Sequence, residues 1–381
     1  MQIALSGNGW YPENVGGLEK YSYGLARALT SDGDSVDYFC TGTPSPWDSH
    51  SRTISIADPR HGTLRRLATM TQNYRNYYKG PYDVVDVHFA FYGLPLLPNV
   101  SKSTARVVHF QGPWALESRA EGASGLSCLA KAAIERFVYN RADRFVVLSE
   151  AFKTILHESY GISRNIIDVI PIGIDCDFFV PTPDREKVRA SLGWRTEVPV
   201  IFTARRLVHR VGVAELIEAT HILKKNGTRV SVKIAGKGPL TELLRASIAE
   251  KGLENEIQLL GFISDEDLVR AYQASDVTVL PTQSLEGFGT ILSESLACGT
   301  PVIGTPVGGI VETLEAIDPS LIAASPSPES IATLIADFCS RRLNVPDTNA
   351  CRMFGEQYAW PTISARNRQT YRMAMLTRAT R

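Results

Sequence analysis

Short apolar segments alternate with helical segments along the whole chain, and this alternation restricts the fold more than any other feature. In the first half, the segments that read as strands fall at residues 2–6, 36–40, 84–89, 106–110 and 144–148. Helical spacing of apolar residues lies between them, as from Leu18 to Leu29. Repeated strand–helix–strand order favours a parallel sheet covered on both faces, in which ligands bind at the carboxyl ends of the strands.

The same alternation starts again after a join that contains Pro171, Pro181 and Pro183. The later strands are expected at residues 198–203, 230–235, 257–260, 277–280 and 301–304. A chain of 381 residues is too long for one ordinary core and suits two domains of α/β size. We therefore predict two similar α/β domains, followed by a basic helix at residues 362–377.

The stretch from Leu285 to Gly304 concentrates groups that can bind an anion. Glu286 and Glu294 stand eight residues apart, and glycines follow the first of them. An apolar helical run carries Glu294 and ends at Gly299, a good residue for a helix C-terminus. Backbone N–H groups at a helix start are unsatisfied and attract phosphates. We expect a phosphate-bearing ligand over residues 286–291.

Glycines and polar groups also follow strands of the first half. Gly7-Asn8-Gly9 and Gly16-Gly17 could let a phosphate or sugar approach the backbone, although an ordinary tight turn explains them equally well. A full dinucleotide fingerprint is missing, which disfavours an NAD-dependent oxidoreductase. His109 ends a strand beside Gly112-Pro113, and we expect its side chain to project into the ligand crevice. A purely structural histidine is the alternative.

Composition excludes some classes of function. Forty basic and forty acidic residues argue against a nucleic-acid binder. We find no secretory signal and no apolar run long enough to span a membrane. Six scattered cysteines fit reduced thiols in a cytosolic protein. The segment Arg60–Lys79 has basic and tyrosine residues and no acidic one. It could contact anionic lipid, be a plain solvated face, or form part of an acceptor-binding wall.

The two halves of the chain together carry an ordered series of motifs. In the first half they are Gly16-Gly17-Leu18-Glu19, His109-Phe110-Gln111-Gly112, residues 146–149 and residues 171–175. In the second half they are Arg206-Leu207-Val208, residues 236–240, residues 260–263, Glu286-Gly287-Phe288-Gly289 with Glu294, and residues 298–309. Over nearly the whole chain this series resembles the retaining glycosyltransferases of family 4, which have the GT-B fold.

The resemblance implies two Rossmann-like, doubly wound parallel-sheet domains that face a central cleft. Residues 1–178 would form the N-terminal domain on the acceptor side. Residues 179–358 would form the C-terminal domain, which holds the nucleotide-sugar donor. Residues 359–381 would form a C-terminal helix that packs back on the N-terminal domain.

The resemblance also assigns roles to residues. Glu294 would accept hydrogen bonds from the ribose, and Glu286 would lie near the donor sugar and the reacting centre. Arg206 would neutralise the β-phosphate of the leaving group, and His109 would contact the donor sugar. The backbone would meet the diphosphate and sugar at Gly16, Gly17, Phe288, Gly289, Thr290 and Ile291. His109, Glu286 and Arg206 are thus the predicted catalytic residues.

One position departs from the family pattern. The family commonly has a lysine five residues after the arginine, and here that residue is Val211. Losing one cation should weaken stabilisation of the leaving group. We hypothesise that Arg205, Arg210 or Lys237 supplies the missing charge. The alternative is that Arg206 and the N–H groups of the helix start suffice.

We predict no metal and no cofactor. Asp-x-Asp occurs at residues 32–34, 175–177 and 265–267, but we interpret these matches as coincidence, with Asp265 expected to cap the following helix. The reaction implied by the resemblance retains the anomeric configuration. No carboxylate can be assigned as a nucleophile on the opposite face of the sugar. We therefore expect front-face substitution through an oxocarbenium-like state, in which the departing phosphate takes the acceptor's proton.

The predicted activity is transfer of a glucose-like hexose from a nucleotide-sugar, first of all UDP-glucose. The acceptor would be a glycan, a lipid-linked sugar or a small molecule in polysaccharide or glycoconjugate biosynthesis. We expect a cytoplasmic protein, with peripheral contact to the cytoplasmic membrane face as an open alternative. The rival functions are a sugar phosphorylase or nucleotide-sugar epimerase of the same shape, and a non-catalytic nucleotide-sugar-binding protein.

Overall fold

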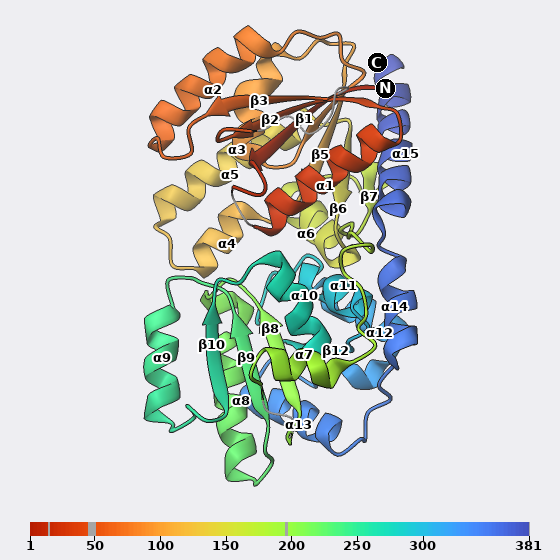
Figure 1. Cartoon of the computed structure of the whole chain (residues 1–381). Helices are drawn as coiled ribbons and strands as arrows, with labels where there is room; N and C mark the ends of the chain where they lie inside the picture. The colour runs from red at the N-terminus through yellow and green to blue at the C-terminus, as the bar shows by residue number, and fades with distance from the viewer. Residues whose placement is uncertain (14–15, 45–50, 195–196, 381) are drawn as a thin grey trace. The chain divides into compact units, whose positions relative to one another are not determined.

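The chain forms two compact units in a computed structural model that describes residues 1–13, 16–44, 51–194 and 197–380 (Figure 1). Unit 1 comprises Met1–Gly173 and Trp360–Arg381, and unit 2 comprises Ile174–Ala359. The chain therefore leaves unit 1, forms all of unit 2 and returns to unit 1 for its last helix. The first boundary lies at residue 173 rather than at the predicted 178.

The described residues of unit 1 form a seven-stranded sheet in the order β3-β2-β1-β4-β5-β6-β7. Every pairing in it is parallel. The strands are β1 (Gln2–Gly9), β2 (Ser35–Thr41), β3 (Arg52–Ala57), β4 (Val84–Val87), β5 (Ala105–Phe110), β6 (Arg144–Val147) and β7 (Ile167–Val169). The order reverses direction between β1 and β4, and this junction is where α/β sheets of this kind open a ligand crevice.

Helices cover both faces of this sheet. One face carries α1 (Gly17–Ser31) and α15 (Trp360–Ala379), which contact each other. The other helices of the unit are α2 (Thr63–Tyr77), α3 (Ala90–Leu96), α4 (Trp114–Ala120), α5 (Gly125–Tyr139) and α6 (Glu150–Tyr160). Strand residues alternate between the faces, so Val85, Val87, Val108 and Phe110 enter the core on the side of α3 and α5. Asp86 and His109 point to the side of α1 and α15.

In unit 2 the part of the chain that the structure describes forms a five-stranded parallel sheet in the order β10-β9-β8-β11-β12. The strands are β8 (Val200–Ala204), β9 (Ser231–Ala235), β10 (Ile257–Gly261), β11 (Val277–Leu280) and β12 (Val302–Gly304). Val200, Ile201 and Phe202 are all fully buried, as expected for a strand that is covered on both faces. The strand order reverses between β8 and β11, so the ligand crevice of this sheet is expected at their carboxyl ends.

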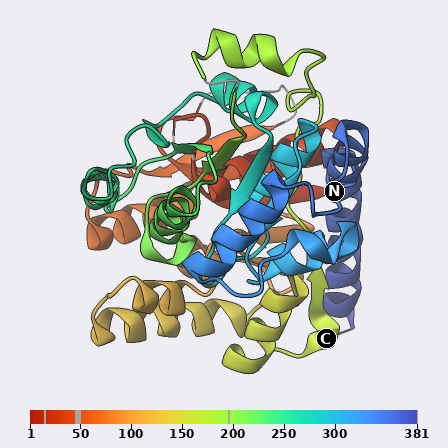
Figure 2. The ribbon, with the colours of Figure 1, turned by 90° about the horizontal axis from the view of Figure 1, so that it is seen from below.

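The helices of unit 2 also form two layers. They are α7 (Arg185–Ser191), α8 (Val213–Lys225), α9 (Thr241–Glu250), α10 (Asp265–Ala274), α11 (Thr290–Ala297), α12 (Gly309–Ile317), α13 (Pro328–Cys339) and α14 (Thr348–Glu356). In one layer α8 contacts α9 and α13, and Figure 2 shows α8 and α13 side by side. In the other layer α11 contacts α10 and α14.

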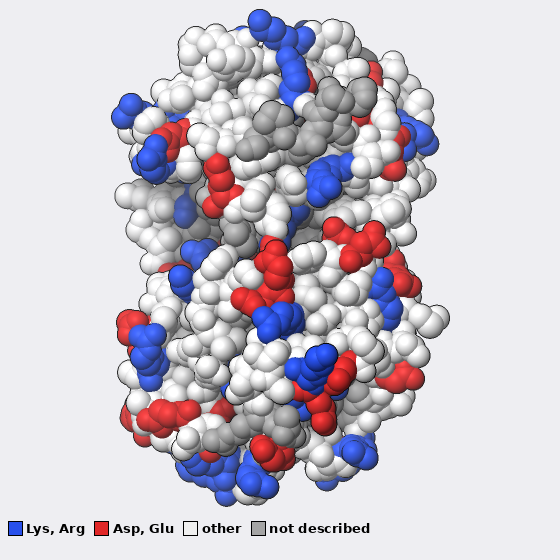
Figure 3. Space-filling model, viewed as in Figure 1, with Lys and Arg blue, Asp and Glu red and all other residues white. Residues whose placement is uncertain are grey.

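The predicted fold class, two doubly wound parallel α/β domains, is confirmed. The prediction missed β3, an edge strand in which only Ile56 and Ala57 are buried, so its apolar pattern is weak. Basic and acidic side chains are interspersed on the face drawn in Figure 3, in line with a formal net charge of zero. Within the described part of the chain, no helix combines the length and apolar character needed to cross a membrane.

Candidate functional site

The loops that follow the strands of unit 2 meet at the carboxyl ends of β8, β9 and β11. They pack so closely that glycine is required at several positions. A Cβ on Gly236 would lie 1.8 Å from the carbonyl oxygen of Arg205, and a Cβ on Gly308 would lie 2.0 Å from that of Glu286. Both glycines also have positive φ. The glycines of the sequence motifs therefore hold the loops of Arg205 and Glu286 in place.

An ion pair that is largely shielded from solvent joins these loops. Arg205 follows β8, and its Nη2 donates to Oε2 of Glu286, which lies in the loop after β11. Thr282 Oγ1 donates to the same carboxylate oxygen at 3.2 Å. Burial alone would raise the pKa of Glu286, but the charge and hydrogen bond of Arg205 outweigh burial, so the pKa lies below its usual value. Glu286 is therefore an anion held in one orientation.

The backbone ahead of Glu286 has an unusual conformation. Leu285 has φ of 55°, a left-handed value that a leucine rarely adopts. Arg210 stabilises this turn, because its Nη1 donates to the Leu285 carbonyl at 3.2 Å and its own carbonyl accepts from Gln283 N at 2.8 Å. Backbone strain of this kind gathers at ligand sites, where the surrounding structure enforces it.

Helix α11 starts where the sequence predicted a helix N-terminus. Gly289 is the N-cap residue with φ of 84°, and Thr290 is the first helical residue. Ile291 is buried in the core, and the Phe288 ring packs against Tyr358 with ring centroids 4.9 Å apart. Phe288 and Ile291 can therefore serve a ligand through their backbone N–H groups, as the resemblance implies, and not through their side chains.

Glu294 lies deeper than expected. The sequence suggested a side chain that projects from the helix, but Glu294 is 4% exposed. Its Oε2 accepts a hydrogen bond of 2.7 Å from the Tyr272 hydroxyl on α10. Helix α11 is buried over nearly its whole length, so even its polar side chains face protein. The proposed contact of Glu294 with a ribose stays a prediction.

The cationic residues near Glu286 have different surroundings. Arg206 is exposed. Lys237 is also exposed, with its Nζ 5.8 Å from the centroid of the Phe262 ring. Val211, at the position where the family pattern has lysine, is 3% exposed and belongs to the hydrophobic core of unit 2. The structure therefore gives the buried cationic position beside Glu286 to Arg205.

In unit 1 the start of α1 already has a carboxylate beside it. Gly16 is the N-cap residue, and a Cβ there would lie 2.2 Å from Oε2 of Glu19. Asn8 Nδ2 donates to Oε1 of Glu19 at 2.6 Å. Burial raises the pKa of this carboxyl. A diphosphate at Gly16 and Gly17, as the resemblance implies, would meet Glu19 as well as the backbone.

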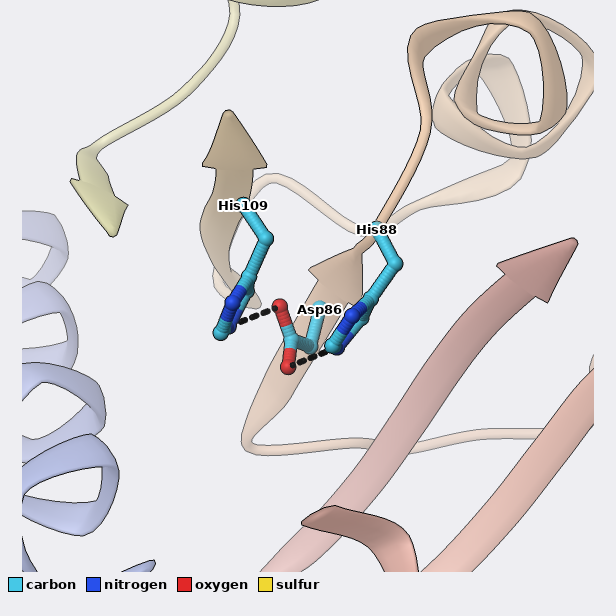
Figure 4. A group of neighbouring side chains, drawn as sticks. All are labelled: Asp86, His88 and His109. Carbon is cyan, nitrogen blue, oxygen red and sulfur yellow. Dashed lines mark hydrogen bonds and ion pairs between the residues drawn. The ribbon is translucent and has the colours of Figure 1, made fainter. Parts of the chain in front are cut away.

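His109 does not project into a crevice, and that expectation is wrong. Its side chain is 1% exposed, with Nε2 3.2 Å from Oδ1 of Asp86 and Nδ1 3.2 Å from the Tyr21 hydroxyl. His88 lies beside it and donates to Oδ2 of Asp86 at 3.1 Å (Figure 4). Tyr371 of α15 donates to the same oxygen at 2.5 Å. His109 points toward α1 and α15 because it shares a sheet face with Asp86.

Asp86, His88 and His109 are close enough to suggest a metal site. Their geometry favours a hydrogen-bond cluster instead. The two imidazole rings are stacked with an interplanar angle of 11° and centroids 4.1 Å apart, so their Nε2 lone pairs cannot point to one ion. Burial alone would raise the pKa of Asp86, but His109 and His88 outweigh it and hold the carboxyl ionised. The carboxylate is the centre of this cluster.

The Asp-x-Asp matches have structural partners. Asp34 pairs with the N-terminal amine at 2.7 Å and with Arg368 at 3.1 Å. Asp175 accepts from the backbone N–H groups of residues 177 and 178, each at 3.1 Å. The predicted cap at Asp265 is wrong, because Ser264 is the N-cap residue of α10. These contacts support coincidence as the explanation.

The sequence prediction missed Asp86 and did not single out Arg205 among the candidate cations. Asp86 was read only as part of an apolar strand, although its spacing to His88 places both on one sheet face. Arg205 was one of three candidate cations, and nothing in the sequence singles it out. Its pairing with Glu286 depends on the neighbouring positions of β8 and β11, which the strand order sets.

Two sequence families match the chain. Residues 184–357 match the family described as Glycosyl transferases group 1. Residues 15–178 match the family described as Glycosyltransferase Family 4. The first match falls within unit 2 and the second covers most of unit 1.

Known proteins resemble the chain over its length. An uncharacterized glycosyltransferase of Methanocaldococcus jannaschii is 26% identical over 395 residues, which cover 98% of this chain and 99% of that protein. Sucrose-phosphate synthase from Thermosynechococcus elongatus superposes with a TM-score of 0.77 at 21% identity, covering 97% and 98% of the two chains. The structure of Anabaena HepE in complex with UDP-glucose superposes with a TM-score of 0.76 at 17% identity. The superposition covers 98% of this chain and 100% of the HepE chain. These solved structures share the GT-B fold with this chain.

Proposed function

The chain belongs to the family 4 glycosyltransferases of group 1, and we propose that it transfers a hexose from a nucleotide-sugar, with UDP-glucose as the donor. The observation that carries the proposal is the charged cluster at the junction of β8 and β11 in unit 2. A largely buried Arg205–Glu286 pair, a left-handed Leu285 and the start of α11 meet there. HepE, which has the same fold, has been solved with UDP-glucose, and this supports the choice of donor.

The proposed chemistry uses charge and orientation. The α11 N-terminus and the cations of residues 205–210 would stabilise the negative charge that develops on the departing diphosphate. Glu286, ionised and fixed by Arg205 and Thr282, would lie at the positively charged sugar centre. The bond between the anomeric carbon and the phosphate oxygen breaks, and the acceptor oxygen bonds to the same face. The acceptor's proton goes to the leaving phosphate. The configuration is then retained.

We propose that this reaction needs neither a metal ion nor a bound cofactor. The protein provides the positive charge that a divalent ion would otherwise bring to the diphosphate. The acceptor would be a glycan, a lipid-linked sugar or a small molecule bound by unit 1. The name of the Methanocaldococcus relative gives no acceptor.

A panel of nucleotide-sugars tests the donor. Thermal unfolding is followed with UDP-glucose, other UDP-sugars, GDP-mannose, ADP-glucose and UDP, with and without EDTA. A ligand at 100 times its Kd stabilises the folded state by about 2.7 kcal/mol. We expect UDP and UDP-glucose to raise Tm, and each to raise it by the same amount with and without EDTA. We also expect the chain to hydrolyse UDP-glucose slowly and so to release UDP. If no nucleotide raises Tm, the proposed function is wrong.

The stereochemistry has a separate test. Once an acceptor is found, NMR of the product reports the anomeric configuration. An α-linked product from α-linked UDP-glucose agrees with retention. A β-linked product would overturn the proposed mechanism.

We further propose that unit 1 makes peripheral contact with an anionic membrane. On α4 and α5, Leu116, Leu126 and Leu129 are 37%, 82% and 68% exposed. Exposed basic residues flank them at Arg119 and Arg136. Apolar side chains beside cations suit the headgroup region of anionic lipid.

Vesicle sedimentation tests this contact. We expect the chain to bind vesicles that contain phosphatidylglycerol more than pure phosphatidylcholine vesicles. Replacing Leu126 and Leu129 by serine should abolish binding without changing Tm, because both side chains are exposed. Equal sedimentation of the double variant and the unmodified chain would contradict the proposal. Leu243→Ser on α9, where the leucine is 57% exposed, is the control.

A further inference from the structure

One largely buried arginine in unit 2 has a side-chain nitrogen that no described residue binds. The side chain of Arg205 is 9% exposed, and its Nη2 donates to Glu286. Its Nη1 is buried and has no hydrogen-bond partner among the described residues. A guanidinium carries five N–H donors, and a buried donor without a partner costs stability. Since no described residue supplies an acceptor for this nitrogen, the acceptor is either solvent or a bound ligand.

The position of Arg205 in the sheet supports a ligand as that partner. It is the first residue after β8, and Glu286 lies in the loop after β11. These strands are neighbours at the point where the strand order reverses. Loops on the two sides of such a point diverge and leave room for a ligand. The Arg205–Glu286 pair spans that junction.

The other cations of this region do not fill the same role. Arg206 and Lys237 are exposed. Arg210 Nη1 donates to the carbonyl of Leu285 and so supports the loop. Val211 is buried in the core and offers no donor. Arg205 is therefore the cation that is fixed by Glu286 and has a nitrogen left over.

The charges around this nitrogen favour an anion. Glu286 offsets the charge of Arg205, but Arg206 and Arg210 stand in the same short segment of chain. The N-terminus of α11, at Thr290, adds the positive end of a helix dipole. A guanidinium with a free N–H edge binds phosphate oxygens in a defined geometry.

We propose that Arg205 is a catalytic residue that binds two partners: Nη2 orients Glu286, and Nη1 donates to a terminal-phosphate oxygen of the nucleoside diphosphate. This rests on the proposed glycosyltransfer. When the bond from the sugar carbon to the phosphate oxygen breaks, its electron pair stays on the phosphate. The acceptor oxygen forms the new bond and its proton passes to the phosphate. Arg205 stabilises the added negative charge and itself gives up no proton.

The test compares UDP with UMP by calorimetry, because UMP lacks the phosphate that Arg205 contacts. In the unmodified chain UDP should bind more tightly than UMP. Arg205→Gln should weaken UDP binding about 10- to 100-fold, as expected for a lost charged hydrogen bond. UMP binding should change less than about twofold, since it makes no such contact. A merely structural role would weaken both nucleotides alike.

Two further variants keep the test decisive. Arg205→Gln leaves Glu286 buried without its cation, so the Arg205→Gln/Glu286→Gln double variant restores neutrality and serves if the single variant unfolds. The double variant should also lose the preference for UDP over UMP. Arg245→Gln, on the exposed face of α9 and paired with Glu242, is the matched control and should keep this preference.

The outcomes separate the two proposals. If the unmodified chain binds neither nucleotide, the proposed function fails. If the unmodified chain prefers UDP and both Arg205 variants keep that preference, the function stands and the role of Arg205 is refuted. A Gly or Ala variant at position 205 whose slow hydrolysis of UDP-glucose recovers with added guanidinium ion would support direct contact with the phosphate.

Discussion

At the scale of single residues, Glu286 and Glu294 differ in surroundings although one short stretch carries both. Glu286 is bound by a cation and a hydroxyl, and the pKa of its carboxyl is lowered. Glu294 lies in the core against Tyr272. The first environment suits stabilisation of a developing positive charge, and the second suits a fixed hydrogen-bond acceptor.

We therefore expect replacement of the two carboxylates to have different effects on kcat and on UDP binding. Glu286→Gln should lower kcat by about 100-fold or more, as for loss of electrostatic stabilisation in a transition state. Glu294→Ala should weaken UDP binding about 10-fold with a smaller effect on kcat. Steady-state kinetics and calorimetry measure both. If both variants changed kcat to the same extent and UDP affinity to the same extent, the two carboxylates would not have these different roles.

The cluster around Asp86 predicts a pH dependence of stability. Burial, and to a lesser degree the neighbouring His109, lower the pKa of His88 to about 4. The unfolded histidine, with a pKa of about 6.5, takes up a proton first as pH falls. The folded state therefore loses stability between about pH 6.5 and pH 4, by about 2 kcal/mol on going from pH 7.5 to pH 5.

Urea unfolding at the two pH values checks this. His88→Gln keeps an amide donor for Asp86 but cannot take up the proton, so its stability should depend less on pH. His209→Gln, at an exposed histidine, is the control and should behave like the unmodified chain. An unchanged pH dependence in His88→Gln would show that another group is responsible.

At the scale of the elements, the loops of unit 2 depend on glycines that permit close backbone contact. Gly308 has φ of 55°, and a Cβ there would meet the carbonyl oxygen of Glu286 at 2.0 Å. Gly252 has φ of 62° with open space around it. Gly252→Ala should cost about 1 kcal/mol through backbone strain alone. Gly308→Ala should cost more and should displace Glu286.

Chemical denaturation measures the loss of stability in the two variants, and UDP affinity reports whether Glu286 and its loop are displaced. We expect Gly252→Ala to bind UDP normally and Gly308→Ala to bind it weakly. Normal UDP affinity in Gly308→Ala would mean that the loop tolerates the shift and does not position the site.

Periodicity and glycine spacing predicted most elements and the start of α11. They could not predict which buried groups meet, since this depends on strand order. Asp86 and Tyr371 are 285 positions apart in the chain and form a hydrogen bond because β4 and α15 belong to one unit. The resemblance placed His109 at the ligand, but the residue's position in β5 turns its side chain toward the helices. Glu294 is buried for a similar reason, since α11 is covered on all sides.

At the scale of the whole molecule, unit 1 is built from both ends of the chain. Tyr371 of α15 is fully buried and completes the hydrogen bonds of Asp86. Trp360 stacks near Tyr21 and fills the space above Gly24 and Gly173. The last helix is therefore part of the fold of unit 1.

Removing one side chain from this helix should destabilise unit 1. Tyr371→Ala should cost about 3–5 kcal/mol in the free energy of unfolding, because it leaves a cavity and takes a donor from a buried carboxylate. Leu376→Ala, where the leucine is 62% exposed, should cost little. Urea unfolding with limited proteolysis shows which unit opens. Equal stability of the two variants would contradict a structural role for α15.

We infer that the junction of β8 and β11 in unit 2 binds a nucleoside diphosphate. A crystal structure of the chain with UDP would show whether it does. We expect the diphosphate at the start of α11, with a phosphate oxygen within hydrogen-bond distance of Arg205 Nη1 and the N–H groups near Thr290. UDP bound at another place, or a diphosphate at this place that leaves Arg205 without contact, would contradict it.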